Sequence, residues 1–473
     1  MNGLFARPHN TETTFPTGES PRLEGSQFKL SAKASGKIGA MIITPARRIN
    51  GRVQIPGDKS ISHRAAIIAA LANGTSRITN FSPSEDCAAT LSCLRNLGVP
   101  IQSEGSSVVV QGAGEAGLRV ANEALYCGNS GSTMRMLAGV VAGQDFSSTL
   151  TGDSSLNSRP MQRIIEPLQL MGAELGSKSG KPPLTIKGSK ALKPIRYELP
   201  VASAQVKSCV LLAGLNAQGR TEIVERVETR DHTERMLEWF GVPLEKSAEG
   251  AIWIDGPRTF AARDVSVPGD ISSAAFLMAA AALLPESRLD AEGVGLNPTR
   301  TMFVSMLRSL GVAIEVTDER EESYEPVGRV GVKGKLSADP PSPVDSTLVR
   351  GNLIAQLIDE LPLLAVVGTQ MPGGIEIRDA AELRRKESDR IDATVKNLRA
   401  MGAEVQEFED GLAVNGRTQL RGAMLDSYGD HRIAMAFAVA ALTAAGDSEI
   451  AGAECVGVSL PDFFTLLESL VER

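Results

Sequence analysis

A short pattern of apolar and polar positions recurs along the chain. A leucine is followed three positions later by a second apolar residue, then by a glycine, and then by Val or Ala before another apolar position. Five copies carry their glycine at Gly98, Gly172, Gly241, Gly311 and Gly402, and a sixth, shorter copy begins at Leu466. The leucine and the apolar residue share one helix face, and the glycine is typical of a left-handed helix end. We therefore predict six units in which a helix ends at the glycine and a strand begins within two residues.

A second repeat relates two distant segments. The sequence IPGDKSISHRAAIIAAL begins at Ile55, and VPGDISSAAFLMAAAAL begins at Val267. Both join Pro-Gly-Asp to an Ala-rich helical pattern. Two halves of three units each account for both repeats and make the chain an α/β protein. We predict one lobe over residues 58–268 and a second lobe built from residues 41–57 together with residues 269–473.

The first 40 residues differ from the rest of the chain. They are rich in Gly, Ser, Thr and Pro, show little apolar periodicity and lack the apolar segment of a secretory signal. We interpret residues 1–40 as a disordered extension, or as residues upstream of the true start. The alternative is an organellar transit segment, against which Glu12, Glu19 and Glu24 argue.

Composition narrows the functional classes. A chain of 473 residues is long enough for two domains. Its net charge of −7 and its 4% of aromatic residues disfavour a nucleic-acid binder. No apolar run reaches the roughly 18 residues of a membrane span, and the stretch over residues 274–284 is typical of a buried helix. The five cysteines form no CxxC pair, which favours reduced thiols in the cytoplasm over disulfides or a zinc site.

The segment PGDKSISHRA is the first candidate site. Pro56 and Gly57 end a strand, and Asp58 or Ser60 caps the helix that follows. Lys59, Ser60 and Arg64 then lie on its first turns, where free N–H groups and positive potential attract anions. The alternative is a capped surface helix with solvated charges. The segment is not a P-loop, because the required glycine spacing is missing.

Three more segments place polar residues or cations at predicted helix starts. CGNSGSTMR offers Gly131 for close approach of a ligand to the backbone, with Ser130, Ser132 or Thr133 as the cap of a helix that carries Arg135. Pro160 at a first helical position would put Arg159 at a helix entrance. SAQVK places its polar side chains before and within a further helix; these are Ser203, Gln205 and Lys207.

The carboxylates of interest lie in the second half. LIDELP buries Asp359 and Glu360 between apolar residues, which is costly unless they are paired or functional. LRRKESDRI contains Lys386, Glu387 and Arg390; its two cations would share one face if the segment were helical, and the alternative is a solvated charged helix. In GDHR, Asp430, His431 and Arg432 precede a buried helix, and we interpret His431 as structural. Cations from both halves would bind a substrate pair with several negative charges. They are Lys59, Arg64, Arg135 and Arg159 from one half, and Lys386, Arg390 and Arg432 from the other.

Taken in order, these motifs resemble the EPSP synthase family. The resemblance runs from about residue 41 to the end of the chain and includes PGDKSISHR, GNSGSTMR, the Arg159-Pro160 loop, SAQVK, IDELP, RRKESDR and GDHR. It implies the two-domain enolpyruvyl transferase fold, an inside-out α/β barrel in which each domain has three βαβαββ units. It also implies transfer of the enolpyruvyl group of phosphoenolpyruvate to the 5-hydroxyl of shikimate 3-phosphate, through addition and elimination, with no metal or organic cofactor.

The resemblance also assigns roles to residues. It makes Asp359 the acceptor of the 5-hydroxyl proton, Glu387 the donor of a proton to the methylene carbon, and Lys59 a cation that contacts both substrates. The shikimate 3-phosphate contacts would be Lys59, Ser60, Arg64, Ser203, Gln205, Asp359 and Lys386. The phosphoenolpyruvate contacts would be Lys59, Gly131, Arg159, Gln205, Arg390 and Arg432. Ala204, Glu382 and Val458 depart from the best-known pattern, and these departures resemble the divergent second class of the family.

Two other interpretations stay open. UDP-N-acetylglucosamine enolpyruvyl transferase shares the fold and the donor, but that family carries a reactive Cys in its Arg-Pro loop, whereas the loop here is TGDSSLNSRP. A non-catalytic repeat protein that binds anions would not need Asp359 and Glu387, and both are present. We expect a cytoplasmic monomer that binds the two small-molecule substrates and neither nucleic acid nor a membrane.

Overall fold

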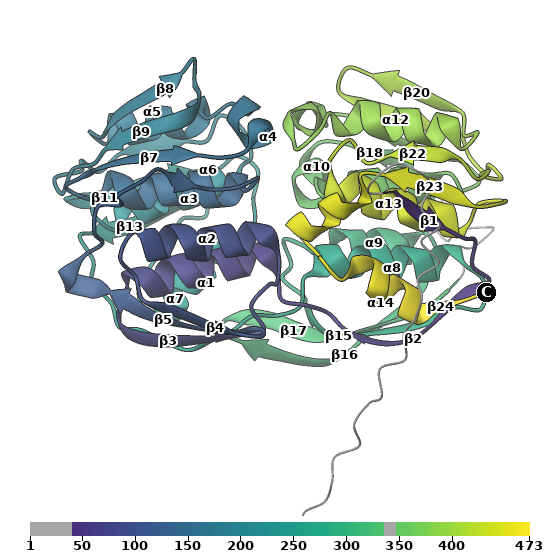
Figure 1. Cartoon of the computed structure of the whole chain (residues 1–473), viewed down its shortest axis with the longest axis horizontal. Helices are drawn as coiled ribbons and strands as arrows, with labels where there is room; N and C mark the ends of the chain where they lie inside the picture. The colour runs from purple at the N-terminus through teal and green to yellow at the C-terminus, as the bar shows by residue number, and fades with distance from the viewer. Residues whose placement is uncertain (1–39, 335–346) are drawn as a thin grey trace, which may run out of the picture.

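The computed structural model of the chain describes residues 40–334 and 347–473. The extension predicted over residues 1–40 therefore lies outside the described residues, apart from its last position. Two lobes lie side by side (Figure 1). One hydrophobic core draws its residues from Ile61 to Val267, and the other from Ile43 to Ile55 together with Ile271 to Leu470. We keep the division near residues 57 and 268 as a proposal that these two cores support.

The first lobe contains three sheets with the same internal order. In each, one pair of strands is parallel and the other two pairings are antiparallel. The first sheet consists of Val265–Ser266 (β14), Asn73–Thr79 (β3), Ser107–Ala113 (β5) and Ile101–Glu104 (β4). The second consists of Leu125–Tyr126 (β6), Ser147–Thr151 (β7), Lys181–Lys187 (β9) and Glu174–Lys178 (β8). The third consists of Arg196–Glu198 (β10), Gly219–Val224 (β11), Ala251–Gly256 (β13) and Glu245–Lys246 (β12).

Three sheets of the second lobe, within the described ranges, repeat this plan with one parallel pair each. The largest consists of Ala313–Glu322 (β16), Glu325–Lys333 (β17), Arg288–Gly295 (β15), Arg48–Gln54 (β2) and Val471–Glu472 (β24). The next consists of Leu348–Val349 (β18), Ile375–Ile377 (β19), Gly411–Val414 (β21) and Val405–Phe408 (β20). The last consists of Met41–Ile43 (β1), Ser448–Ala451 (β23) and Met424–Asp426 (β22). The repeated order confirms the predicted fold class.

Each unit has one inner helix that is apolar on nearly every face. The inner helices of the first lobe are Lys59–Leu71 (α1), Gly131–Ala142 (α3) and Ala204–Gly214 (α6). Those of the second lobe are Ile271–Leu283 (α8), Leu361–Gly368 (α11) and His431–Leu442 (α13). A helix without a polar face must be buried, and in each lobe these helices pack against one another with the sheets outside them (Figure 1).

The second helix of each unit carries the repeat found in the sequence. These helices are Glu85–Asn96 (α2), Gln162–Leu170 (α5), His232–Trp239 (α7), Met302–Ser309 (α9), Arg390–Ala400 (α12) and Phe463–Leu470 (α14). The five repeat glycines have φ between +80° and +99°, so the predicted left-handed helix ends are confirmed. The following strand begins within two residues, as predicted, after Gly172 and Gly311, and three or four residues later in the other three units. Pro100 and Pro243 lengthen two of these turns, because proline has no N–H for a strand ladder.

Five short helical segments complete the fold. They are Gly114–Ala116 (η1), Ser154–Ser158 (α4), Asn352–Leu357 (α10), Ala381–Arg385 (η2) and Ala453–Val458 (η3). None of the helices in the described ranges is long and apolar enough to cross a membrane.

The lobes are joined where the two Pro-Gly-Asp segments cross. Gly57 and Gly269 form an antiparallel bridge, and the Asp58 N–H donates to the Pro268 carbonyl at 2.8 Å while the Asp270 N–H donates to the Pro56 carbonyl at 2.9 Å. A Cβ at residue 57 would lie 1.7 Å from the Asn80 carbonyl oxygen, so only glycine fits this crossing.

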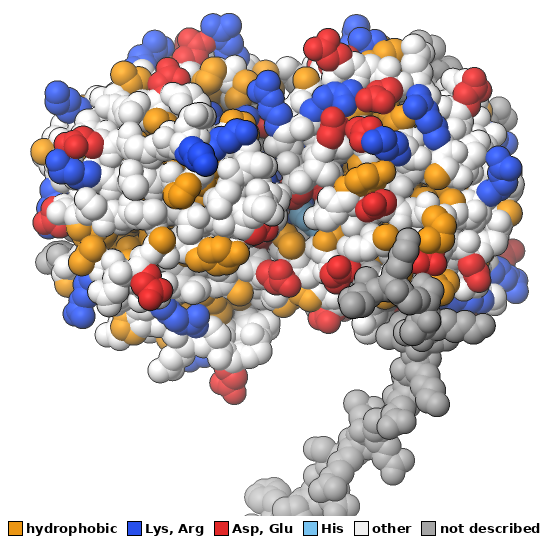
Figure 2. Space-filling model, turned by 45° about the horizontal axis from the view of Figure 1, so that its top comes forward, with side chains coloured by type: hydrophobic (Ala, Val, Ile, Leu, Met, Phe, Trp, Pro, Cys, Tyr) orange, Lys and Arg blue, Asp and Glu red, His pale blue; other side chains and the backbone are white. Residues whose placement is uncertain are grey.

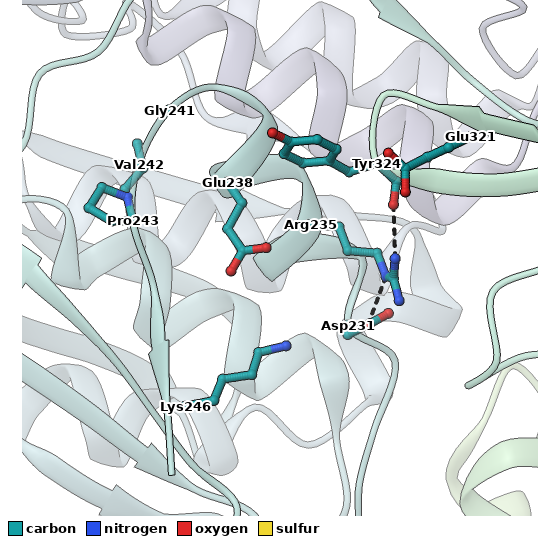
Figure 3. A pocket seen from close by; sticks show the side chains of 9 residues that line it. All are labelled: Asp231, Arg235, Glu238, Gly241, Val242, Pro243, Lys246, Glu321 and Tyr324. Carbon is teal, nitrogen blue, oxygen red and sulfur yellow. Dashed lines mark hydrogen bonds and ion pairs between the residues drawn. The ribbon is translucent and has the colours of Figure 1, made fainter.

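The hairpin of β16 and β17 makes a further contact between the lobes. The Tyr324 ring at its tip lies edge-on to Trp239 of α7, with the ring centres 5.2 Å apart. The Arg235 guanidinium donates to the Tyr324 carbonyl at 2.9 Å and to Asp231 at 2.8 Å. Asp231, Arg235 and Tyr324 line a surface cavity of about 610 Å³ (Figure 3). The crossing segments and the hairpin together define the side on which the lobes are connected.

One local prediction is wrong, and a helix that the sequence left open is absent. Helix α5 begins at Gln162 with Met161 as its N-cap, so Pro160 precedes the helix and Arg159 ends α4. The charged run LRRKESDRI is not one helix. It leaves η2 in an extended conformation at Lys386, and α12 starts at Arg390 because the Asp389 carboxylate caps the N–H groups of the next turn.

Candidate active site

The starts of all six inner helices converge on one cavity between the lobes. The cavity has a volume of about 660 Å³, and its lining includes residues at or beside the first turn of each of these helices. The contributing residues are Lys59 and Ser60, Gly131 and Ser132, Ser203 and Ala204, Asp270, Asp359, and His431 and Arg432. Unpaired N–H groups and the helix dipole make each start attractive to anions. Six such starts give the cavity a strong preference for anionic ligands.

Local sequence explains why the helices begin at these positions. Side-chain oxygens of Asp58, Ser130, Ser203, Asp270 and Asp430 accept from backbone N–H groups of the first turns of α1, α3, α6, α8 and α13. The choice that the sequence left open is thereby resolved: Asp58 rather than Ser60 caps α1, and Ser130 caps α3. Such caps each stabilise a helix start by about 1 kcal/mol.

The structure brings together all but one of the residues predicted for the site. Those that line the cavity are Lys59, Ser60, Gly131, Arg159, Ser203, Gln205, Asp359, Lys386, Glu387, Arg390 and Arg432, together with Arg135. Arg64 does not line it. Its guanidinium is buried and donates to the Ser60 carbonyl, Ser208 and Thr233. Burial lowers the pKa of Arg64 to about 10. Its three acceptors hold the guanidinium between α1, α6 and α7, away from the cavity.

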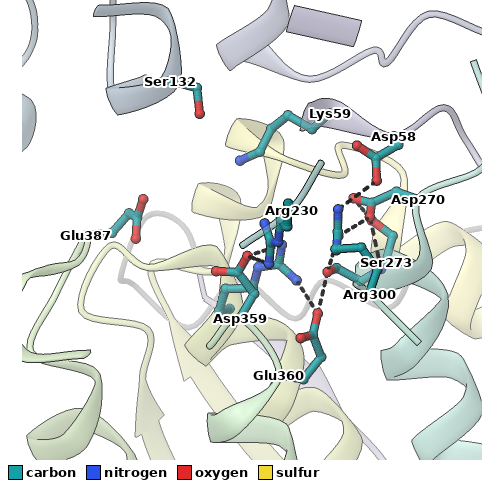
Figure 4. A network of polar contacts seen from close by, with 12 residues as sticks. Asp58, Lys59, Ser132, Arg230, Asp270, Ser273, Arg300, Asp359, Glu360 and Glu387 are labelled. Carbon is teal, nitrogen blue, oxygen red and sulfur yellow. Dashed lines mark hydrogen bonds and ion pairs between the residues drawn. The ribbon is translucent and has the colours of Figure 1, made fainter. Parts of the chain in front are cut away.

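Lys59 and Asp86 form a pair on the first-lobe wall. The Lys59 Nζ lies 3.0 Å from Asp86 Oδ2, and both side chains are mostly buried. Burial is the largest influence and would lower the pKa of Lys59, but the nearby carboxylates of Asp86 and Glu387 together raise that pKa. Lys59 therefore keeps its charge in the substrate-free cavity. Figure 4 shows its side chain pointing into the space between the lobes.

Glu387 is held by an arginine from each lobe. Arg159 Nη1 of the first lobe lies 3.2 Å from Glu387 Oε1, and Arg390 Nη2 of the second lies 2.7 Å from Glu387 Oε2. Burial would raise the pKa of Glu387, but Arg390 and then Arg159 hold it well below the usual range of a glutamate. Glu387 is therefore ionised while no substrate is bound.

Asp359 is the second carboxylate that bridges the lobes. Its Oδ2 lies 2.5 Å from Arg230 Nη2 of the first lobe, and its Oδ1 lies 3.4 Å from Arg390 Nη1. Arg432 Nη2 is 4.0 Å away. Burial would raise the pKa of Asp359, but Arg230 and Arg432 lower it well below the usual range of an aspartate. An ionised Asp359 can accept a proton from a bound hydroxyl.

Within the described ranges, Arg432 has two unused donors, whereas Arg135 and Arg159 each have one, at Nε. The Nε and Nη1 of Arg432 are buried and have no hydrogen-bond partner among the described residues. Glu360 Oε1 is 3.9 Å from Arg432 Nη1, which is too far for a direct hydrogen bond. Donors that are buried and unpaired are costly, so Arg432 is prepared to receive an anion from the cavity.

A polar network connects Asp359 to the crossing of the lobes (Figure 4). Glu360, next in the chain, accepts a short hydrogen bond from Ser272, and Ser272 accepts from Arg300 Nη2 at 2.7 Å. Arg300 also pairs with Asp58 at 3.2 Å and with Asp270 at 3.3 Å. The two carboxylates that cap α1 and α8 therefore share one cation.

Gln205 and Arg135 shape the floor beside Gly131. Gln205 Nε2 donates to Ser132 at 2.8 Å, and Arg135 Nη1 donates to Gln205 Oε1 at 2.5 Å. A Cβ at position 131 would lie 2.7 Å from Arg135 Nη1. The glycine thus leaves space for the arginine, whose pKa burial lowers to about 10.

Several residues of the cavity were not found from the sequence. Asp86, Arg163, Arg230 and Arg300 line it. These residues lie outside the motifs that start the inner helices. Asp86 does lie on the first turn of α2, which Ser84 caps, but a capped helix start alone does not indicate which cavity it faces. Asp270 was detectable, because the second Pro-Gly-Asp repeats the first. The structural interpretation of His431 is wrong. Its ring lines the cavity, and its Nδ1 has no partner among the described residues.

Charges of both signs gather where the lobes meet, as Figure 2 shows. Within the described ranges, no group of three or more His, Cys, Asp and Glu side chains is arranged to hold a metal ion. The arrangement suits a pair of anionic substrates that contact cations of both lobes while Asp359 and Glu387 exchange protons with them.

Comparisons with known proteins agree with this chemistry. The family model described as EPSP synthase (3-phosphoshikimate 1-carboxyvinyltransferase) matches residues 43–467. A 3-phosphoshikimate 1-carboxyvinyltransferase of Koribacter versatilis is 50% identical over 433 residues, which are 91% of this chain and 99% of the relative. The enzyme of the same name from Solibacter usitatus is 48% identical over 431 residues, again 91% of this chain and 99% of the relative.

Solved structures give the same match at the level of the fold. The structure of EPSP synthase from Acinetobacter baumannii superposes with a TM-score of 0.80 at 40% sequence identity. The match covers 92% of this chain and 98% of that one.

Proposed function

This chain belongs to the EPSP synthase family, and from that premise we propose that it transfers the enolpyruvyl group of phosphoenolpyruvate to the 5-hydroxyl of shikimate 3-phosphate. The products are 5-enolpyruvylshikimate 3-phosphate and phosphate, in the biosynthesis of aromatic amino acids. The observation that carries the proposal is the single cavity in which six helix starts, cations of both lobes and two ionised carboxylates converge.

Shikimate 3-phosphate binds along the first-lobe wall and reaches the second. Ser60, Ser203, Gln205 and Lys386 contact it, and Asp359 accepts from its 5-hydroxyl. Arg230 adds a cation that the sequence did not suggest. Arg64 joins these contacts only if it leaves Ser208 and Thr233, so we assign it a smaller share of binding.

Phosphoenolpyruvate binds where Arg159, Arg390 and Arg432 meet. Guanidinium forks match both its carboxylate and its phosphate. The unpaired donors of Arg432 receive one of these groups, and Gly131 lets the other approach the start of α3. Lys59 lies between the two substrates and contacts both.

The first chemical step is an addition. Asp359 takes the proton of the 5-hydroxyl as that oxygen bonds to C2 of phosphoenolpyruvate, and Glu387 delivers a proton to C3. The resulting tetrahedral carbon carries both the new ether and the phosphate. The positive field of the helix starts stabilises this charged intermediate.

The second step is an elimination. Phosphate leaves from C2 while a proton is removed from C3, which restores the double bond on the new ether. Glu387 is the group placed to take that proton back. Its carboxylate therefore serves as acid in the first step and as base in the second.

Glu387 must gain a proton before it can act as an acid. In the substrate-free cavity its pKa is held well below the usual range by Arg390 and Arg159. When phosphoenolpyruvate takes these arginines as its own partners, the stabilisation of the carboxylate weakens and its pKa rises. Substrate binding and protonation of the acid are thus coupled.

We further propose that the chain works as a cytoplasmic monomer. Every side chain assigned a role comes from one chain, so a second copy is not needed. The five cysteines are unpaired, which fits a reducing compartment.

The test is release of phosphate from phosphoenolpyruvate, measured with and without shikimate 3-phosphate. We expect turnover only with both substrates, and a loss of about 10²- to 10⁴-fold in kcat for Asp359→Asn. A parallel assay replaces shikimate 3-phosphate with UDP-N-acetylglucosamine. The proposal would be refuted by turnover with UDP-N-acetylglucosamine but not with shikimate 3-phosphate. Equal rates for the parent and Asp359→Asn would refute the proposed role of Asp359.

A further inference from the structure

The edge of the first lobe that faces the cavity meets the second lobe along one seam. Ser155, Arg159 and Arg163 lie four residues apart across α4 and the start of α5, and all three contact residues 382–387. Ser155 Oγ donates to the Glu387 carbonyl at 3.4 Å, and Arg159 pairs with the Glu387 carboxylate. Arg163 pairs with Glu382 of η2. Of these three contacts, only the one between Arg163 and Glu382 involves neither Arg159 nor Glu387, which have roles in the proposed reaction.

The pair of Arg163 and Glu382 has the geometry of a strong ion pair. Arg163 Nη1 donates to Glu382 Oε1 at 2.7 Å, and Nη2 donates to Oε2 at 3.2 Å. Two parallel bonds of this kind fix the relative orientation of both groups. The side chains are 16% and 33% exposed, so salt screens the pair less than a pair on the open surface.

Electrostatics around Glu382 favour its ionised form. Burial is the largest influence and would raise the pKa of Glu382, but Arg163, Lys386 and Arg135 together lower it. An unpaired carboxylate on this rim would repel a phosphorylated substrate. Because Arg163 neutralises Glu382 and both of its terminal nitrogens are occupied, the pair joins the lobes rather than holding substrate.

The position of the pair gives it leverage on the lobes. The crossing at Gly57 and Gly269 and the contact of Tyr324 with Trp239 lie on the connected side. In Figure 1, α4 and α5 lie at the top of the molecule and the β16–β17 hairpin at the bottom. A bond on the side opposite the connection must break when the lobes separate there, so its free energy counts toward the closed arrangement alone.

We propose that Arg163 and Glu382 form a clasp that stabilises the closed arrangement of the lobes, in which the contacts to both substrates are assembled. This inference rests on the proposed function, because it concerns the same cavity. In a two-state equilibrium, the apparent affinity for substrates falls with the fraction of molecules that are closed. The clasp therefore acts on binding of both substrates and leaves the chemical step in the closed complex unchanged.

The experiment is a double-mutant cycle with Arg163→Gln, Glu382→Gln and the double variant. Each single variant is expected to raise KM for both substrates about three- to tenfold, with kcat within about twofold of the parent. The KM of the double variant is expected to be no higher than that of the single variant with the higher KM, because the two changes break the same bond. Lys187→Gln and Glu174→Gln, which break an exposed pair within the first lobe, are the matched controls and leave KM unchanged.

Small-angle X-ray scattering gives an independent measure. Without substrates, all three clasp variants are expected to have a larger radius of gyration than the parent, and the two controls are not. The clasp proposal would be wrong if the effects of the two single substitutions on KM were additive in the double variant. It would also be wrong if the radius of gyration were unchanged in all three variants. A parent protein without turnover would instead refute the proposed function, so the two failures are distinguishable.

Discussion

Arg230 and Asp359 meet across the cavity with Nη2 and Oδ2 2.5 Å apart, although 129 residues separate them in the chain. Arg230 is the first neighbouring cation responsible for the low pKa of Asp359, against burial, which would raise it. We predict that Arg230→Gln raises the pKa of Asp359. The acidic limb of kcat/KM then moves to higher pH, because the base is protonated earlier as pH falls.

The measurement is kcat/KM between about pH 4.5 and pH 9 for the parent, Arg230→Gln and Arg226→Gln. Arg226 lies in the same loop but pairs with Glu198 on the surface, at 81% and 50% exposure. Arg226→Gln should therefore leave the pH profile of kcat/KM unchanged. If the Arg230→Gln profile keeps the parental acidic limb, the pair does not control the base.

Binding of phosphoenolpyruvate should be accompanied by proton uptake at Glu387. The carboxylate is ionised before binding because Arg390 and Arg159 hold its pKa low, and it loses both partners to the substrate. We expect uptake of about one proton near pH 7. Titration calorimetry in buffers of different ionisation enthalpy measures it, in an Asp359→Asn background that prevents turnover. Adding Glu387→Gln should abolish the uptake, and equal uptake in both proteins would contradict this coupling.

His63 should make the protein less stable in mild acid. Its ring is fully buried, with Nδ1 2.7 Å from Thr90 Oγ1, and burial followed by Lys59 and Arg64 lowers its pKa well below the usual value. The unfolded chain binds this proton near pH 6.5, whereas the folded chain does not. His63 therefore does not lower the free energy of unfolding above about pH 6.5. Below that pH, it lowers the free energy of unfolding by up to about 1.4 kcal/mol per pH unit.

Urea unfolding of the parent and His63→Asn between about pH 5 and pH 8 tests the effect. Asparagine preserves a partner for Thr90 but carries no titrating group. Its free energy of unfolding should depend less steeply on pH below about 6.5. Parallel curves for the two proteins would exclude His63 as the cause.

Two glycines should respond to alanine for different reasons. Gly172 has φ of +99° and open space around a Cβ, so Gly172→Ala should cost only the conformational strain, about 1 kcal/mol. Gly57 lies at the crossing, where a Cβ would overlap the Asn80 carbonyl. Gly57→Ala should cost more than about 3 kcal/mol, since backbone must move. Urea midpoints compare them, and a similar loss in both would contradict the steric argument.

Several features of the fold follow from local pattern alone. The leucine–apolar–glycine repeat located the ends of five helices, because a left-handed helix end favours glycine wherever it occurs. The caps at Asp58 and Ser130 likewise depend on neighbours within three residues. Where local signals competed, the prediction failed. Pro160 predicts a helix that starts at residue 160, whereas α5 begins at Gln162. The charges of residues 384–390 are compatible with one helix, whereas Asp389 caps a new helix at Arg390.

Many charged and polar residues of the cavity were also accessible from the sequence. Motifs at the starts of the inner helices supply Lys59, Ser60, Gly131, Ser203, Gln205, Asp359 and Arg432. The segments that lead into α5 and α12 supply Arg159, Lys386, Glu387 and Arg390. Their partners were not accessible in this way. Asp86 beside Lys59, Arg230 beside Asp359 and Arg163 beside Glu382 lie outside the motifs that start the inner helices. No periodicity relates residues that are 129 or 219 positions apart.

The sequence by itself determined the repeated units, the helix starts and the set of groups able to bind anions and move protons. Only the tertiary structure decided which charges neutralise one another, that Arg64 turns behind α1, and that His431 faces the cavity. The reason is physical: helix ends and caps are set by short-range sterics and hydrogen bonds, whereas ionisation and pairing depend on burial and on charges brought close by the packing of two lobes.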